Sequence, residues 1–98
     1  MATASLSATV RTVAGKGTAR KLRAAGEVPA IVYGHGRAPQ SLALNEHVLN
    51  QLLSKISYTT TVIELDVTGA AMARTIIREI QRHPVKRNIL HVDFQELV

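Results

Sequence analysis

The sequence predicts a small, mainly β domain: a six-stranded, mostly antiparallel β-barrel with flanking helices. Three observations lead to this fold class. Apolar and polar residues alternate in several short segments, turn residues separate these segments, and a length of 98 residues suits one compact core. Hydrophobic residues make up 46% of the chain but only three residues are aromatic, so that core must be largely aliphatic. Residues 1–98 contain no repeat or low-complexity linker and are expected to form a single domain.

The N-terminal third is predicted to contain a strand, a short helix and a second strand. Residues 5–12 alternate between apolar and polar side chains, which is typical of a half-buried strand. After a glycine-containing loop at 15–17, residues 18–25 are expected to form a helix that Gly26 stops. Residues 28–33 form a compact β-prone segment, which glycines interrupt.

A second helix follows a short strand in the middle of the chain. Leu42 and Leu44 indicate that strand, and Asn45 is a good N-cap for a helix that continues to about residue 54. The apolar stripe of this helix is expected to comprise Val48, Leu49, Leu52 and Leu53.

Three strands are predicted in the C-terminal part. Residues 58–67 alternate, Thr68-Gly69 is a turn, and residues 72–81 form the returning strand, whose mixed alternation leaves its inward face undetermined. Pro84 ends that strand. The last strand, residues 89–95, alternates cleanly, with Leu90, Val92 and Phe94 on one face and His91, Asp93 and Gln95 on the other.

The predicted core draws one to three apolar side chains from each of these elements except the strand at 72–81, whose inward face is undetermined. Its members are Leu6, Val10, Leu22, Ile31, Leu44, Val48, Leu52, Ile63, Leu65, Leu90, Val92 and Phe94.

Charge limits the classes of partner. Twelve Lys and Arg face seven Asp and Glu, a net charge of +5. Residues 1–26 hold five of the basic residues and no acidic one, and a second basic run at 74–87 is interrupted only by Glu79. A basic domain attracts nucleic acid, anionic membrane or acidic protein surfaces. Ordinary solvated charge is the alternative for either run alone.

Membrane insertion and disulfide formation are not expected. No apolar stretch approaches the roughly 20 residues needed to cross a bilayer. The absence of cysteine excludes a disulfide framework and a thiolate zinc site, and it fits a reducing compartment. The acid-poor N-terminus is also typical of an organellar transit peptide, although the same segment is predicted to form a strand.

Catalytic and metal-binding motifs are weak. The segment 15–18 matches a phosphate-binding loop poorly, because its lysine is followed by glycine instead of Ser or Thr. His83, His91 and Asp93 have no local metal-site spacing, so no metal or cofactor is expected. Nothing nominates a nucleophile or an acid–base pair, and the chain is predicted not to be an enzyme.

RNA binding is the function that the residues favour. The basic loop and helix at 15–23 and the polar strand face at 91–95 could form one surface against the minor groove of duplex RNA. An outward carboxylate such as Asp93 is unsuited to phosphates but can accept a hydrogen bond from an exocyclic amine. The scarcity of aromatic residues argues against a stacking platform for single strands.

Four segments, in order and with fitting spacing, carry a family resemblance over nearly the whole chain. They are residues 15–23 (GKGTARKLR), 26–34 (GEVPAIVYG), 81–86 (QRHPVK) and 91–94 (HVDF). Together they resemble large-subunit ribosomal protein twenty-five, the family that includes the Ctc general stress proteins.

The resemblance implies a six-stranded β-barrel that binds the loop E region of 5S rRNA, through a widened minor groove, in the large subunit of the cytoplasmic bacterial ribosome. Partners would be 5S rRNA and neighbouring large-subunit components, with the protein monomeric apart from the ribosome. The implied contacts are Arg11, Lys16, Arg20, Arg23, Tyr33, Gln81, Arg82, His91 and Asp93.

Some positions depart from the family pattern. Arg78 is Gln in some relatives and is expected to add a phosphate contact. Ala19 stands where relatives often carry Ser, and Gly26 stands where some carry Asn, so those two contacts are expected to be lost or replaced. Longer members continue past the equivalent of Phe94 into a second β-rich domain, so the chain is either a short form or the N-terminal domain of a longer protein.

Two other functions stay open on the residues alone. One is a protein–protein adaptor whose basic face meets an acidic partner. The other is a small hydrolase that uses His91 and Asp93. Salt-dependent binding would argue against the hydrolase, and dependence on RNA sequence and shape would argue against the adaptor.

Overall fold

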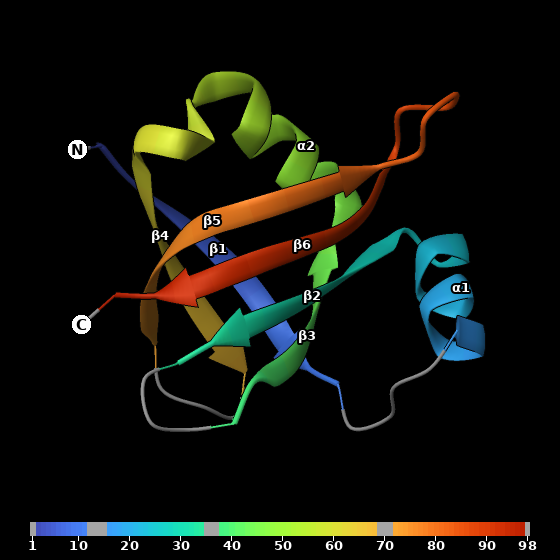
Figure 1. Cartoon of the computed structure of the whole chain (residues 1–98), viewed down its shortest axis with the longest axis horizontal. Helices are drawn as coiled ribbons and strands as arrows, with labels where there is room; N and C mark the ends of the chain where they lie inside the picture. The colour runs from blue at the N-terminus through green and yellow to red at the C-terminus, as the bar shows by residue number, and fades with distance from the viewer. Residues whose placement is uncertain (1, 12–15, 35–37, 69–71, 98) are drawn as a thin grey trace.

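The computed structural model is a closed barrel with two helices outside it (Figure 1). It describes residues 2–11, 16–34, 38–68 and 72–97, and within the first helix it describes side chains from residue 20 onward. The elements are β1 (Ala2–Val10), α1 (Lys16–Ala24), β2 (Glu27–Tyr33), β3 (Gln40–Asn45), α2 (Glu46–Lys55), the 3-10 helix η1 (Tyr58–Thr60), β4 (Thr61–Thr68), β5 (Ala73–Arg82) and β6 (Ile89–Glu96).

The barrel confirms the predicted fold class. Around the ring the strands follow the order β1-β3-β2-β6-β5-β4. Four neighbouring pairs are antiparallel, namely β1–β3, β2–β3, β4–β5 and β5–β6. The pairs β1–β4 and β2–β6 are parallel and join strands that are distant in the sequence. These two pairings close the ring.

The interior is filled by aliphatic side chains around one aromatic ring. Phe94, Leu65, Ile63, Leu44 and Leu6 are buried, as predicted. Figure 1 shows α2 lying over one end of the barrel. From there α2 adds a buried Leu49 to the core, and Leu52, Leu53 and Ile56 pack partly against it.

Several predicted core positions are wrong. Val10 ends β1 at the rim of the barrel and is 37% exposed, and Val48 is 46% exposed because Leu49 occupies the core-facing side of α2. Leu22 and Ile31 are only half-buried, since one lies on the external helix α1 and the other on the outer face of β2. The predicted strand start at Tyr58 is also wrong.

Local hydrogen bonds explain the helix boundaries. The Val48 backbone N–H donates to Asn45 Oδ1 at 3.0 Å, which confirms Asn45 as the N-cap of α2. Gly26 follows α1 with φ of +81°, the left-handed conformation that favours glycine after a helix. The start of α1 at Lys16 makes Gly17 helical, not part of a loop as predicted. Residues 58–60 form η1, so β4 begins only at Thr61.

Two irregularities in the β5–β6 ladder explain the mixed alternation of β5. The pairing passes from Ile77–Phe94 to Glu79–Asp93, which leaves Arg78 as an extra residue. It then passes from Gln81–His91 to Arg82–Ile89, which leaves Leu90 as an extra residue on β6.

The second of these irregularities reverses the predicted inward side of β6 at its start. Ile89 is fully buried and Leu90, which was predicted to lie in the core, is half-buried. Each bulge therefore changes which side chains face the interior.

Substitution of Ile89 tests this reversal. Ile89→Ala should lower the free energy of unfolding by about 2–5 kcal/mol, because it opens a cavity in a packed core. Leu90→Ala is the matched control and should cost clearly less, since the Leu90 side chain is half-buried. Chemical denaturation of both variants measures the difference, and a larger loss for Leu90→Ala would contradict the bulge.

Candidate nucleic-acid interface

One surface of the barrel collects half of the predicted site residues. It is the outer face of three adjacent strands, β2, β6 and β5, and we call it the polar face. Strand register aligns His91 with Gln81 across β6 and β5, and it aligns Asp93 with Glu79 on one side and Ile31 on the other. The side chains that define the polar face are Tyr33, Arg78, Glu79, Gln81, His91, Asp93 and Gln95.

His91 and Asp93 form a hydrogen-bonded pair at the centre of the polar face. His91 Nδ1 lies 2.8 Å from Asp93 Oδ1, and the two side chains are 31% and 20% exposed. Because an ionised carboxylate only accepts, the contact assigns the hydrogen to Nδ1. His91 Nε2 and the second Asp93 oxygen are not used in this contact. The predicted pairing of the two side chains on one strand face is confirmed.

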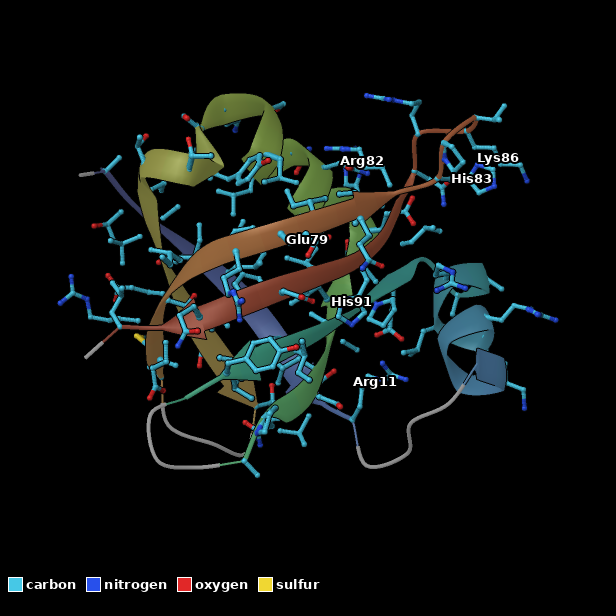
Figure 2. The ribbon with its side chains drawn as sticks, in the orientation of Figure 1. Arg11, Glu79, Arg82, His83, Lys86 and His91 are labelled. Carbon is cyan, nitrogen blue, oxygen red and sulfur yellow. The ribbon has the colours of Figure 1, made fainter. Side chains whose placement is uncertain are left out.

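The bulge at Arg78 turns two successive side chains of β5 outward. Arg78 and Glu79 are both exposed, although neighbouring residues of a regular strand face opposite sides. Glu79 therefore lies opposite Asp93 on the polar face. Figure 2 shows Glu79 on β5 and His91 on β6.

Tyr33 supports the end of the polar face through its ring and its backbone. The Arg78 guanidinium carbon lies 5.4 Å from the Tyr33 ring centroid, within the range of a cation–π contact. Gln95 Nε2 donates to the Tyr33 carbonyl at 3.2 Å, across the parallel β2–β6 pair. These contacts link all three strands of the face.

Helix α1 lies beside the polar face at the start of β2 (Figure 1). The Arg23 guanidinium donates to the Leu90 carbonyl at 3.5 Å, a long hydrogen bond that joins α1 to β6. Leu90 is the extra residue of its bulge, where the ladder is locally disrupted, and this leaves its carbonyl available. Arg20 is exposed on the same helix. The Lys16 side chain lies outside the described residues.

The loop between β5 and β6 carries further basic residues. Arg82 ends β5 and donates from Nη1 to the Arg87 carbonyl at 3.2 Å. Figure 2 shows His83 and Lys86 on this loop. The loop and α1 therefore place cationic side chains near the polar face.

Arg11 follows β1 and reaches the surface from another part of the barrel. Its backbone N–H donates to the Ser41 carbonyl at 2.9 Å, and its side chain lines an open hollow of about 430 Å³ with residues 38–41. Figure 2 shows Arg11 below His91 in this view.

Three residues on or beside the polar face were not among the predicted site residues. They are Glu79 and Gln95 on the face itself and Lys86 on the loop between β5 and β6. Glu79 was detectable only as the one acid within a basic run, because the bulge that turns it outward breaks the alternation. Gln95 lies two residues after Asp93 and four after His91, so the alternation of β6 predicts that it faces outward with them.

Metal binding and membrane spanning find no support in the parts of the chain that the structure covers. Among the described residues, no three His, Cys, Asp or Glu side chains are grouped to hold a metal ion. His83 was considered as a metal ligand together with His91 and Asp93. In the structure its Nδ1 instead accepts hydrogen bonds from backbone N–H groups of its own loop. No helix within the described ranges has the length and apolar character to span a membrane.

Comparison with known proteins identifies the family. The model of the Ribosomal L25p family matches residues 6–94. The chain belongs to the ribosomal L25p family. This match covers every strand and helix described above, apart from the first residues of β1 and the last residues of β6.

Curated members of the L25p family align over most of the chain. Large ribosomal subunit protein bL25 of Bordetella avium is 39% identical over 90 residues, which are 92% of this chain and 46% of that protein. Its namesake from Thiobacillus denitrificans is 41% identical over 90 residues, 92% of this chain and 44% of the relative. The bL25 of Ralstonia nicotianae is 38% identical over 87 residues, 89% and 42% of the two chains. The chain spans less than half the length of these relatives.

The two arginines of α1 should differ in their effect on stability. Arg23→Ala should lower the free energy of unfolding by about 0.5–1.5 kcal/mol and speed amide exchange in α1, because the hydrogen bond to Leu90 is lost. Arg20→Ala removes the same charge from an exposed position and should leave both quantities almost unchanged. Identical behaviour of the two variants would show that Arg23 does not anchor the helix.

Proposed function

We propose that this chain is a non-enzymatic RNA-binding constituent of the large ribosomal subunit, and that it binds 5S rRNA in the loop E region through the polar face and α1. Membership of the L25p family supports the ribosomal role, since its curated relatives are named large ribosomal subunit proteins. The observation that carries the RNA contact is the polar face itself, with acceptors at its centre and arginines around it.

Affinity would come from the cationic side chains. Arg20, Arg82 and Lys86 are exposed on α1, at the end of β5 and on the loop between β5 and β6. Each can neutralise a phosphate and release counterions, which gives binding that weakens with salt and depends little on sequence. Arg78 would add to this set where it covers the Tyr33 ring.

Specificity would come from the centre of the polar face. A carboxylate repels phosphates, so Asp93 and Glu79 are suited to donors, such as exocyclic amines or 2′-hydroxyls in a wide minor groove. His91 uses Nδ1 on Asp93, which leaves Nε2 to accept from the same kinds of donor. Non-canonical base pairs place such donors in positions that differ from those of a regular duplex, which gives the carboxylates a shape to distinguish.

The proposed setting follows from the same role. The chain would act in the cytoplasm as part of the ribosome, without cofactor or metal, and it would be monomeric apart from its ribosomal partners. Residues 1–98 would form a single RNA-binding β-barrel domain. The alternative function is a protein–protein adaptor whose basic face binds an acidic partner. A titration with RNA distinguishes the two functions.

The test is a titration of the purified protein against 5S rRNA at several salt concentrations. The matched RNA is a 5S variant whose loop E is restored to plain Watson–Crick pairing. Tight, salt-sensitive binding to the native RNA alone supports the proposal. Equal binding to both RNAs would show that the protein binds polyanions without recognising loop E. No binding to either RNA would favour the adaptor.

Arg20→Ala should weaken binding to 5S rRNA by about 1–3 kcal/mol and make the slope of log K against log salt shallower by about one. Lys55→Ala is the control, because it removes one exposed charge from the end of α2, on another side of the barrel. A slope that Arg20→Ala leaves unchanged would remove Arg20 from the phosphate contacts.

Asp93→Asn should reduce discrimination between native loop E and the Watson–Crick variant more than it reduces general RNA affinity. Asparagine keeps the shape of the side chain and an oxygen for His91, but loses the charge that favours amine donors. Paired titrations of both RNAs measure the ratio of affinities. Equal losses on the two RNAs would exclude a specificity role for Asp93.

A further inference from the structure

Hydrogen bonds to His83 connect the two sides of the loop between β5 and β6. The His83 N–H donates to the Asn88 carbonyl and the Arg87 N–H donates to the His83 carbonyl, both at 2.9 Å. Arg87 has φ of +67°, an uncommon conformation for a residue with a side chain. Such a conformation persists only where the surrounding contacts impose it.

The His83 imidazole completes this set of contacts from inside the loop. Its Nδ1 atom accepts hydrogen bonds from the backbone N–H groups of Val85 at 3.2 Å and Lys86 at 3.1 Å. An atom that accepts from two donors carries no hydrogen, so the contacts assign the neutral ring with its hydrogen on Nε2. Nδ1 is bonded to Cγ, as Oδ1 is in asparagine, and it here takes the place of that oxygen in an Asx turn.

Neutral acceptors are well suited to this loop because its charges are all positive. Arg82, Lys86 and Arg87 lie within six successive residues, and no carboxylate occurs between Ile80 and Val92. Their mutual repulsion favours an open loop. Hydrogen bonds accepted by backbone carbonyls and by the imidazole oppose this repulsion within the loop.

The loop conformation in turn places the Arg82 guanidinium. Arg82 Nη1 donates to the Arg87 carbonyl at 3.2 Å, and that carbonyl belongs to the residue with positive φ. A change in the loop therefore moves the acceptor on which Arg82 rests. A long arginine side chain without that acceptor samples many rotamers, which weakens any contact that needs one position.

We propose that His83 is a positioning residue for RNA binding: its Nδ1 fixes the loop between β5 and β6, and the loop fixes Arg82 beside the polar face. The inference rests on the proposed function, since it assumes that Arg82 contacts RNA. His83 itself touches no RNA in this scheme. Its contribution is to reduce the freedom that Arg82 and Lys86 lose on binding.

Two substitutions at His83 test whether the position of the acceptor atom, and not the size of the side chain, determines RNA affinity. His83→Asn keeps an acceptor one bond from Cγ and precedes Pro84, a pair that favours turn initiation. Affinity for 5S rRNA should stay within about twofold of the unmodified protein. His83→Gln moves the acceptor one methylene further out and should weaken binding roughly fivefold to tenfold.

Amide exchange reports on the loop without RNA. The Val85 and Lys86 N–H groups should exchange faster in His83→Gln and keep their protection in His83→Asn. Thermal unfolding midpoints should be similar in the two variants, since the loop lies outside the barrel core. Equal exchange in all three proteins would overturn the capping role of Nδ1.

A double-mutant cycle tests whether His83 acts through Arg82. In the Arg82→Ala background, His83→Gln should cause little further loss of affinity, and an undiminished loss would overturn the route through Arg82. Equal affinity of His83→Gln and the unmodified protein would overturn this inference alone. Failure of the unmodified protein to bind 5S rRNA would overturn the proposed function and the inference with it.

Discussion

The parallel pairing of β2 with β6 is the constraint on which the functional surface depends. It joins a strand from the first third of the chain to the last strand, over the pairs from Ala30–Val92 to Tyr33–Gln95. Without it the polar face would be divided, since Tyr33 lies on β2 and the residues of the other two strands belong to the β5–β6 hairpin. The same pairing brings α1, which precedes β2, close enough to β6 for Arg23 to reach the Leu90 carbonyl.

Two bulges in the β5–β6 ladder connect the core to the site. Each inserts one residue and so exchanges the inward and outward faces of its strand. At Arg78 the exchange turns two successive polar side chains outward. At Leu90 it buries Ile89 and provides a carbonyl for Arg23. An uninterrupted hairpin of the same composition would bury a different set of residues and present fewer polar groups.

Local patterns predicted the elements of this fold better than their pairing. Alternation identified the strands, the Asn45 cap and Gly26 marked the helix ends, and the common face of His91 and Asp93 followed from period two. Leu90 and Val48 were misplaced because a bulge and a helix rotation are set by tertiary packing. The position of Glu79 and the link from His83 to Arg82 depend on hydrogen bonds that no periodicity encodes.

The parallel β1–β4 pairing also determines the order in which this domain can assemble. Its register runs from Ala2–Thr61 to Thr9–Thr68, so β1 cannot pair along its length with β4 until the residues up to Thr68 have been synthesised. Bringing the ends of so long a segment together costs conformational entropy. This cost grows with the length of the segment and arises before the contacts form. Folding is therefore expected to begin in the local β4–β5–β6 meander and to end with ring closure by β1, more slowly than in a helical domain of equal size.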